Sequence, residues 1–171
     1  MITYKEMNED ELNRITEIDI SEHGTLIYYF KDGTLAPTSE EWYRPQWTTE
    51  SWREGAWTTL LDRGSIKIWG AFDLERLVGL AVYRPNLTKT TAQLLALFVS
   101  NNFRRKGIAS DLLQYICRQT KEDGYQYLYV SATPSASAVG FYMAHGFQPA
   151  ENIHPELYEL EPEDIHMVKT L

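Results

Sequence analysis

Residues 94–113, LLALFVSNNFRRKGIASDLL, contain the transition from an apolar strand to a helix on which the fold prediction depends. The apolar run ends at Ser100, and three consecutive cations then precede Gly107 and a helix with apolar periodicity. A helix N-terminus carries free backbone N–H groups and a partial positive charge, so it can hold a phosphate group. Glycine lets a ligand approach the backbone closely. We therefore expect a phosphate or pyrophosphate site in this segment.

The alternative interpretation of this segment is a solvated basic turn before an ordinary helix. The pattern Arg-x-x-Gly-x-Ala over 104–109 is too short to indicate an anion site by itself. Its position at the junction of a strand and a helix is what supports that interpretation. The chain has neither the Gly-x-Gly start of a Rossmann turn nor the Gly-Lys-Ser/Thr of a P-loop. These two nucleotide-binding loops are therefore excluded.

The segments around this junction predict a sheet with helices on its faces. Three consecutive strands come first, followed by alternating helices and strands. The expected elements are strands at 66–72, 77–83 and 90–99, a helix at 106–122, a strand at 125–131, a helix capped by Thr133 with Pro134 at its first position, and closing strands from Phe147 and at 165–170 with an acidic loop between them.

The N-terminal part is less regular. We expect a strand at 2–7, a short amphipathic helix at 9–18, a strand at 25–30 that enters a tight Asp32-Gly33 turn, and a helix at 49–61. With the later elements, this order predicts a single-domain mixed α/β fold. Its core is a twisted mixed sheet of about seven strands flanked by helices.

The composition limits the classes of partner. The chain has 171 residues with 16 Lys and Arg against 24 Asp and Glu, a net charge of −8. This acidic balance argues against a nucleic-acid or anionic-membrane binder, because both require a basic face. The single cysteine excludes an intramolecular disulfide. The start, MITYKEMNEDEL, has no apolar signal region, so we expect a cytoplasmic protein.

Two blocks of the sequence resemble the GNAT superfamily of acyl-CoA-dependent N-acyltransferases. Residues 104–109, RRKGIA, are similar to the pyrophosphate loop of that family, and residues 131–147, SATPSASAVGFYMAHGF, are similar to its other conserved block. The resemblance implies a GNAT-like fold with splayed central strands at the CoA site. It also implies one N-acetyltransferase domain over 1–171, in which 1–64 is the acceptor-side half with a variable insert and 65–171 the acyl-CoA-binding half.

The resemblance further implies which residues bind acetyl-CoA and act on it. Tyr142 matches the tyrosine that donates a proton to the departing thiolate, and Ser135 replaces an asparagine that many members have in the cofactor site. No metal is implied. The other cofactor-binding residues are Leu97, Phe98 and Val99 along the pantetheine arm, and Arg104, Arg105, Lys106, Gly107, Ile108, Ala109 and Ser110 around the pyrophosphate.

The general base is the main departure from the family pattern. Many members carry a glutamate in the third consecutive strand, where this chain has Leu95 and Ala96. An ammonium group like that of lysine must lose a proton before it attacks, so another base or a relaying water is needed. Glu22 is the first candidate, with a solvated carboxylate at a helix end as the alternative. His23 and His166 are the others.

Two further features allow a structural or a functional interpretation. Cys117 lies on the predicted 106–122 helix, where a small packing residue is expected, so we reject it as an acyl-carrying nucleophile. Tryptophans at 42, 47, 52 and 57 either pack in a core or lid, or form an acceptor pocket for a cationic amine together with Glu22, Glu40, Glu41 and Glu50.

The sequence thus predicts an N-acetyltransferase that moves an acetyl group from acetyl-CoA to a primary amine of a small cationic molecule by direct transfer. The alternatives are a protein or peptide acceptor, and a CoA-binding sensor module that has lost catalysis. A nucleotide-phosphate binder that uses only 104–109 is a third class. The oligomeric state stays open, and a homodimer is compatible with the sequence.

Overall fold

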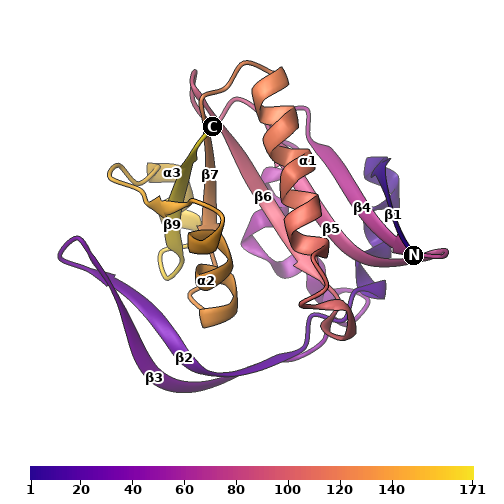
Figure 1. Ribbon diagram of the computed structural model, residues 1–171, viewed down its shortest axis with the longest axis horizontal. Coiled ribbons are helices and arrows are strands. Elements are labelled where there is room, and N and C mark those ends of the chain that lie inside the picture. Colours follow the sequence, from indigo (N-terminus) through magenta and orange to yellow (C-terminus); the bar gives the residue numbers. More distant parts are fainter.

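The computed structural model describes residues 1–171, and a seven-stranded mixed sheet forms its centre (Figure 1). The strands lie in the order β1-β4-β5-β6-β7-β9-β8, and only β6 and β7 are parallel neighbours. Their bounds are β1 Ile2–Met7, β4 Lys67–Asp73, β5 Arg76–Arg84, β6 Thr91–Val99, β7 Tyr127–Ala132, β8 Gln148–Pro149 and β9 Ile165–Thr170. The prediction of a single mixed α/β domain with about seven strands is confirmed.

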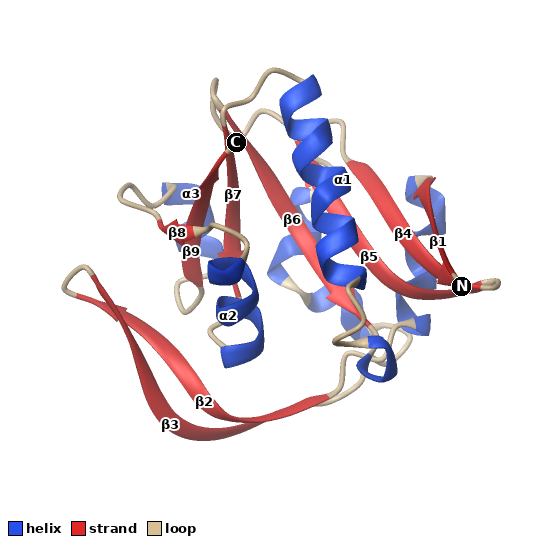
Figure 2. Ribbon diagram, viewed as in Figure 1, coloured by secondary structure: helices blue, strands red, loops and turns tan.

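Helices cover both faces of the sheet (Figure 2). The alternation of side chains along β5 shows how: Leu80 and Val82 pack in one buried cluster, and Ala81 and Tyr83 in the other. One face carries α1 (Ile108–Glu122) and α2 (Ala136–Ala144), and the other carries the 3-10 helix η1 (Glu9–Glu17), the short turns η2 and η3, and α3 (Pro155–Leu160). None of these helices combines the length and apolar character needed to cross a bilayer.

The two central parallel strands separate after three residue pairs. β6 pairs with β7 only from Thr91 to Gln93, and the strands then diverge (Figure 2). Just beyond this point the pairing of β6 with β5 is interrupted: Tyr83 faces Leu94 and Val82 faces Ala96, so Leu95 is an extra residue. Such a β-bulge bends a strand and increases its twist. The bulge therefore accounts for the splayed strands that were expected.

A long β-hairpin leaves the sheet and extends past α2 (Figure 1). It consists of β2 (Glu22–Lys31) and β3 (Thr34–Arg44), and the Asp32-Gly33 turn between them has φ angles of 51° and 73°. Two positive φ angles are typical of the type I′ turn that fits the twist of a hairpin. The backbone N–H of Tyr28 donates to the carbonyl of Pro134, 2.7 Å away, and fastens the hairpin beside α2.

The helix predicted at 49–61 is wrong. This segment forms two 3-10 turns, η2 (Ser51–Glu54) and η3 (Ala56–Leu60), which are separated by the extended backbone of Gly55. Glycine is costly in a helix. The Thr58 hydroxyl also donates to the carbonyls of Arg53 and Gly55, and such bonds compete with a regular helix.

Three further boundaries differ from the sequence prediction. The helix at 9–18 is confirmed in position but takes the tighter 3-10 form. Ser135, not Thr133, caps α2: the Ser135 side chain accepts the Ala138 N–H, while Pro134 still belongs to the extended segment that binds the hairpin. The acidic stretch taken as a loop contains α3, whose fully buried Leu157 anchors it to the core.

Candidate active site

A cleft of about 760 Å³ opens where β6 and β7 diverge. The end of β6, residues 103–110, the end of β7, α2 and the loop between α3 and β9 form its wall. Glu22 and Arg44 close one side from the base of the hairpin, and Trp57 of η3 also lines it. Tyr142, Glu22 and all residues assigned to acetyl-CoA except Lys106 line this cleft. The fold thus brings together segments that lie far apart in the sequence.

Six consecutive backbone N–H groups at the start of α1 donate to no protein acceptor. They belong to residues 105–110, whereas the next one, Asp111, bonds to the Gly107 carbonyl. Arg105 and Gly107 have φ angles of 63° and 84°, so the backbone alternates between left-handed and right-handed conformations. This alternation creates an anion-binding concavity, which the partial positive charge of the helix N-terminus strengthens. The segment can therefore hold a phosphate through backbone atoms alone.

The edge of β6 that faces the cleft has no strand partner from Leu94 to Val99, because the pairing with β7 stops at Gln93. Its other edge stays paired with β5 as far as Val99. An extended ligand carrying amide groups can add to such an edge as another strand would. This edge leads toward the anion-binding segment at 105–110.

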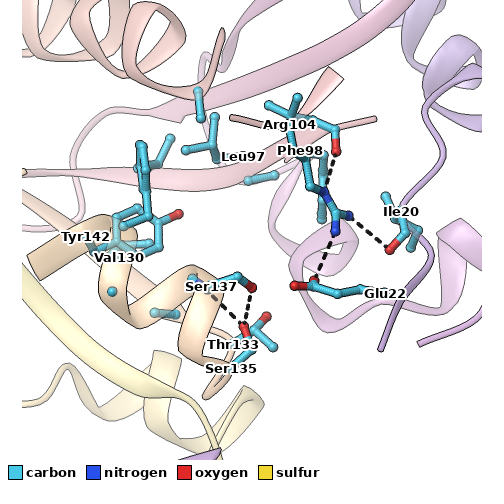
Figure 3. Close-up of a pocket in the computed structure, with 18 of the residues that line it drawn as sticks. Ile20, Glu22, Leu97, Phe98, Arg104, Val130, Thr133, Ser135, Ser137 and Tyr142 are labelled. Atoms are coloured by element: carbon cyan, nitrogen blue, oxygen red, sulfur yellow. Dashed lines mark hydrogen bonds and ion pairs between the residues drawn. The ribbon is translucent and has the colours of Figure 1, made fainter. Parts of the chain in front are cut away.

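Arg104 is bound to the protein rather than free in the cleft (Figure 3). Its guanidinium donates to the carbonyls of Val99 and Ile20, at 3.2 and 3.3 Å, and lies 3.4 Å from Glu22 Oε2. Arg44 also donates to that oxygen, at 2.9 Å. Glu22 thus joins two arginines and links the hairpin base to the segment before α1. Lys106 points elsewhere, with Nζ over the Phe103 ring at 4.9 Å.

Tyr142 offers an unpartnered hydroxyl to the cleft. Its side chain is only 7% exposed, and its ring packs edge-on against Phe141 and Phe147, with centroids 5.3 and 5.2 Å apart. No protein group bonds to the hydroxyl, although it lines the cleft. Burial raises the pKa of Tyr142, and the nearby Asp164 raises it further. The phenol therefore keeps its proton in the ground state and can donate it to a strong base.

Ser110 and His145 form a hydrogen bond across the start of α1 and the end of α2. The Ser110 Oγ lies 2.9 Å from His145 Nε2, and His145 Nδ1 lies 2.8 Å from the Phe141 carbonyl. A carbonyl only accepts, so Nδ1 carries a proton, and in the neutral ring Nε2 accepts from Ser110. His145 lines the cleft and was not singled out in the sequence.

The loop between α3 and β9 places a pair of carboxyl groups in the cleft that sequence reasoning missed. Glu161 and Asp164 both line it, and their side chains lie within hydrogen-bonding reach of each other. Burial raises the pKa of Glu161 to about 8, and Asp164 contributes to this shift. Burial also raises the pKa of Asp164, while its contact with Glu161 opposes that rise. The pair therefore retains a proton at a pH where an exposed carboxyl group would be ionised.

The two histidines considered as bases lie outside the cleft. His166 is buried, and burial lowers its pKa. Its Nε2 donates to the Glu161 carbonyl at 3.1 Å, so in the neutral ring Nδ1 accepts the Tyr129 hydroxyl at 2.8 Å. His23 is exposed on the hairpin, 2.9 Å from Glu41. Neither ring lines the cavity.

Most of the aromatic residues of the N-terminal half are packing groups. Only Trp57 of the four tryptophans lines the cleft. Trp47 and Trp57 both pack on the Phe98 ring, at 4.9 and 5.9 Å, while Trp52 is buried below them. Glu40, Glu41 and Glu50 lie outside the cleft, each next to another polar side chain. Cys117 also lies outside it, and burial raises the pKa of its thiol.

Comparison with known proteins gives a family match to the sequence, a partial match to one curated relative, and a similar fold in solved structures. Residues 34–147 match the model of the acetyltransferase (GNAT) family. Human N-acetyltransferase 8 is 34% identical over 94 residues, which cover 52% of this chain and only 41% of that protein. Nourseothricin acetyltransferase gives a TM-score of 0.75 at 15% identity, over 99% of this chain and 98% of that one. PaiA N-acetyltransferase from Thermoplasma acidophilum, in complex with coenzyme A, gives 0.64 at 17% identity, over 100% and 99%.

Proposed function

The chain belongs to the acetyltransferase (GNAT) family, and on this premise we propose that it moves an acetyl group from acetyl-CoA to a primary amine of a small cationic molecule. It is an acyltransferase by family. Both substrates bind at once, and the amine attacks the acyl carbon directly. The cleft where β6 and β7 diverge is the site of this reaction.

The residues present fit acetyl-CoA, which supplies the activated acyl group as a thioester. The six free N–H groups of residues 105–110 suit the pyrophosphate, and the unpaired edge of Leu97–Val99 suits the amides of the pantetheine arm. We call residues 94–110 the CoA side of the cleft. A backbone N–H near Phe98 would polarise the thioester carbonyl.

Four other lining residues, Glu22, Trp57, Glu161 and Asp164, form what we call the amine side of the cleft. Its carboxyl groups suit a cationic amine through charge, and Trp57 suits it through a cation–π contact. The amine side thus combines part of residues 1–64, the proposed acceptor half, with the loop before β9. Tyr142 lines the same cleft, where a phenol can protonate the departing thiolate.

One observation carries the proposal: the unpartnered Tyr142 hydroxyl and the six free N–H groups of 105–110 line the same cleft. A free phenol titrates near pH ~10 and a thiol near ~8.5, so proton transfer from Tyr142 to the thiolate is uphill by itself and becomes favourable when the acidic proton on the newly bonded nitrogen returns to the Tyr142 oxygen. A nucleotide-phosphate binder would require only the N–H groups.

The test has a binding step and a turnover step. We expect acetyl-CoA, and not ATP, to raise the melting temperature of the purified chain. We also expect CoA release, followed with a thiol reagent, on a panel of 1,4-diaminobutane, nourseothricin and a peptide with a free N-terminus. Stabilisation without release on any amine would indicate the sensor module. Release with the peptide alone would shift the acceptor to proteins.

A further inference from the structure

The backbone between α3 and β9 brings Glu161 and Asp164 together. The N–H of Asp164 donates to the Glu161 carbonyl at 3.2 Å and closes a turn there. The next residue, Ile165, pairs with Ala132 at the end of β7, so the turn lies against the splayed strands. Both side chains face the cleft from this turn. The turn and the register of β9 on β7 therefore place both carboxyl groups at the cleft.

No lysine or arginine neutralises this pair. The groups that face it are His166 on β9, Tyr142 on α2 and Glu163 in the same turn, which also lies near Tyr29 of the hairpin, while His154 acts on His166 rather than on the pair. His166 is neutral in this environment, because burial lowers its pKa. Glu22, by contrast, has two arginines within 3.4 Å. A buried carboxylate pair without a cation costs free energy, which a cationic ligand would offset.

A second and independent feature points to a ligand at this place. Tyr142 is more than nine-tenths buried, yet its hydroxyl has no partner and lines the same cleft. Asp164 is the charged group that acts on that phenol. A proton donor without an acceptor and a carboxyl pair without a cation thus lie next to each other.

We propose that the Glu161–Asp164 pair accepts the proton that the substrate ammonium loses before its nitrogen attacks. This role rests on the acetyl transfer proposed above. The N–H bond breaks, its electron pair stays on nitrogen, and the proton passes to a carboxylate oxygen of the pair. Nitrogen then bonds to the acyl carbon, and the C–S bond breaks with its electrons on sulfur.

The remaining protons balance through Tyr142 and solvent. Tyr142 gives its hydroxyl proton to sulfur, and the second proton released from nitrogen returns to the Tyr142 oxygen. The carboxyl pair passes its proton to solvent. The net reaction of ammonium and thioester therefore gives an amide, a thiol and one proton, with no further reactant.

The role predicts a pH dependence whose direction follows from the raised pKa of Glu161. Below pH about 8 the pair already holds a proton, so it accepts another one poorly. For a cationic amine, kcat/KM should therefore rise with pH and level off above about 8. For an amine that is uncharged at neutral pH, this rise should be absent.

The test compares two nucleophiles in two variants. We expect Glu161→Gln to lower kcat/KM for 1,4-diaminobutane about 100-fold and to remove its rise toward pH 8. Hydroxylamine needs no prior loss of a proton, so its rate should fall less than about threefold. Glu159→Gln removes the same charge from an exposed site on α3 and should leave both rates unchanged. Equal losses with both amines, or an unchanged diamine profile, would overturn the proposal.

A titration without turnover separates this proposal from the proposed function. In protein labelled with ¹³C at Glu and Asp carboxyls, one carboxyl should titrate near pH 8, move to lower pH when 1,4-diaminobutane is added, and disappear in Glu161→Gln. If the wild type acetylates no amine but this titration is seen, the transferase function fails and the cation site stands. If every carboxyl titrates below about pH 5, the pair is not the proton acceptor, whatever the enzyme acetylates.

Discussion

In the proposed reaction the CoA side of the cleft uses backbone groups of one continuous segment, residues 94–110, whereas the amine side uses side chains from three separate segments. The free N–H groups at 105–110 depend on conformation and tolerate many side chains. Glu22, Trp57 and the Glu161–Asp164 pair depend on their chemical identity. The backbone geometry of the CoA side can therefore stay the same for different amine substrates. The amine side can adapt to a new amine through single substitutions.

The largest effect on turnover is expected at Tyr142, the proposed proton donor. Tyr142→Phe should lower kcat about 100-fold, because the leaving thiolate loses its proton donor. The dissociation constant for acetyl-CoA should change less than twofold, since the ring stays. Steady-state kinetics at saturating substrate and calorimetry check both values. Tyr158→Phe, on the exposed face of α3, is the matched control. An unchanged kcat would remove Tyr142 from the mechanism.

The next effect tests whether the CoA side relies on its backbone. Gly107→Ala should weaken acetyl-CoA binding about tenfold, because alanine is strained at a φ of 84° and shifts the neighbouring N–H groups. Lys106→Ala should weaken it less than about threefold, since an exposed charge is screened. Calorimetry at one fixed salt concentration gives both constants. The reverse order of effects would mean that side-chain charge, not backbone, holds the cofactor.

A smaller effect distinguishes a structural carboxylate from a base on the amine side. Glu22→Gln should lower the melting temperature by about 4 °C, since two partly buried arginines lose a counter-charge worth about 1–2 kcal/mol. Differential scanning calorimetry measures the shift, with Glu41→Gln as the exposed control. The pH profile of kcat/KM should keep its shape. A flattened profile would instead identify Glu22 as the base.

The smallest effect concerns Ser135, which was assigned to the cofactor. Ser135→Ala removes the cap of α2 and should cost about 1 kcal/mol, or a fall of about 2–4 °C in melting temperature. Acetyl-CoA binding should stay within twofold. Thermal unfolding with Ser65→Ala, at an exposed serine outside the cleft, as control isolates the loss of the cap. A tenfold loss of affinity without loss of stability would make Ser135 a ligand rather than a cap.

The sequence predicted the CoA side better than the amine side, for a physical reason. Strand, turn and helix at 94–113 follow from local periodicity, and the free N–H groups follow from that local structure. Glu161 and Asp164 could not be found this way, since they looked like any solvated acidic stretch. Their burial arises from α3 and from the pairing of β9 with β7. Long-range register of this kind leaves no local pattern.

Arg104 and Glu22 show a second limit. Both occupy the cleft as the sequence predicted, but their charges face each other. A motif indicates that a cation is present at a position and does not indicate which acceptor it chooses. The Asp32-Gly33 hairpin turn is the opposite case, because the two residues themselves require its backbone angles.

The bulge at Leu95 also changes which residues of β6 face each side of the sheet. Before it, the even-numbered Ala92 and Leu94 pack beneath α1; after it, the odd-numbered Leu97 and Val99 do so, and Phe98 turns to the tryptophans. Deletion of the extra residue would restore a regular ladder with these side chains on the same faces, and it would remove the bend that separates β6 from β7. The length of β6 therefore determines whether the cleft opens, and β6 should tolerate substitutions at Leu95 better than its deletion.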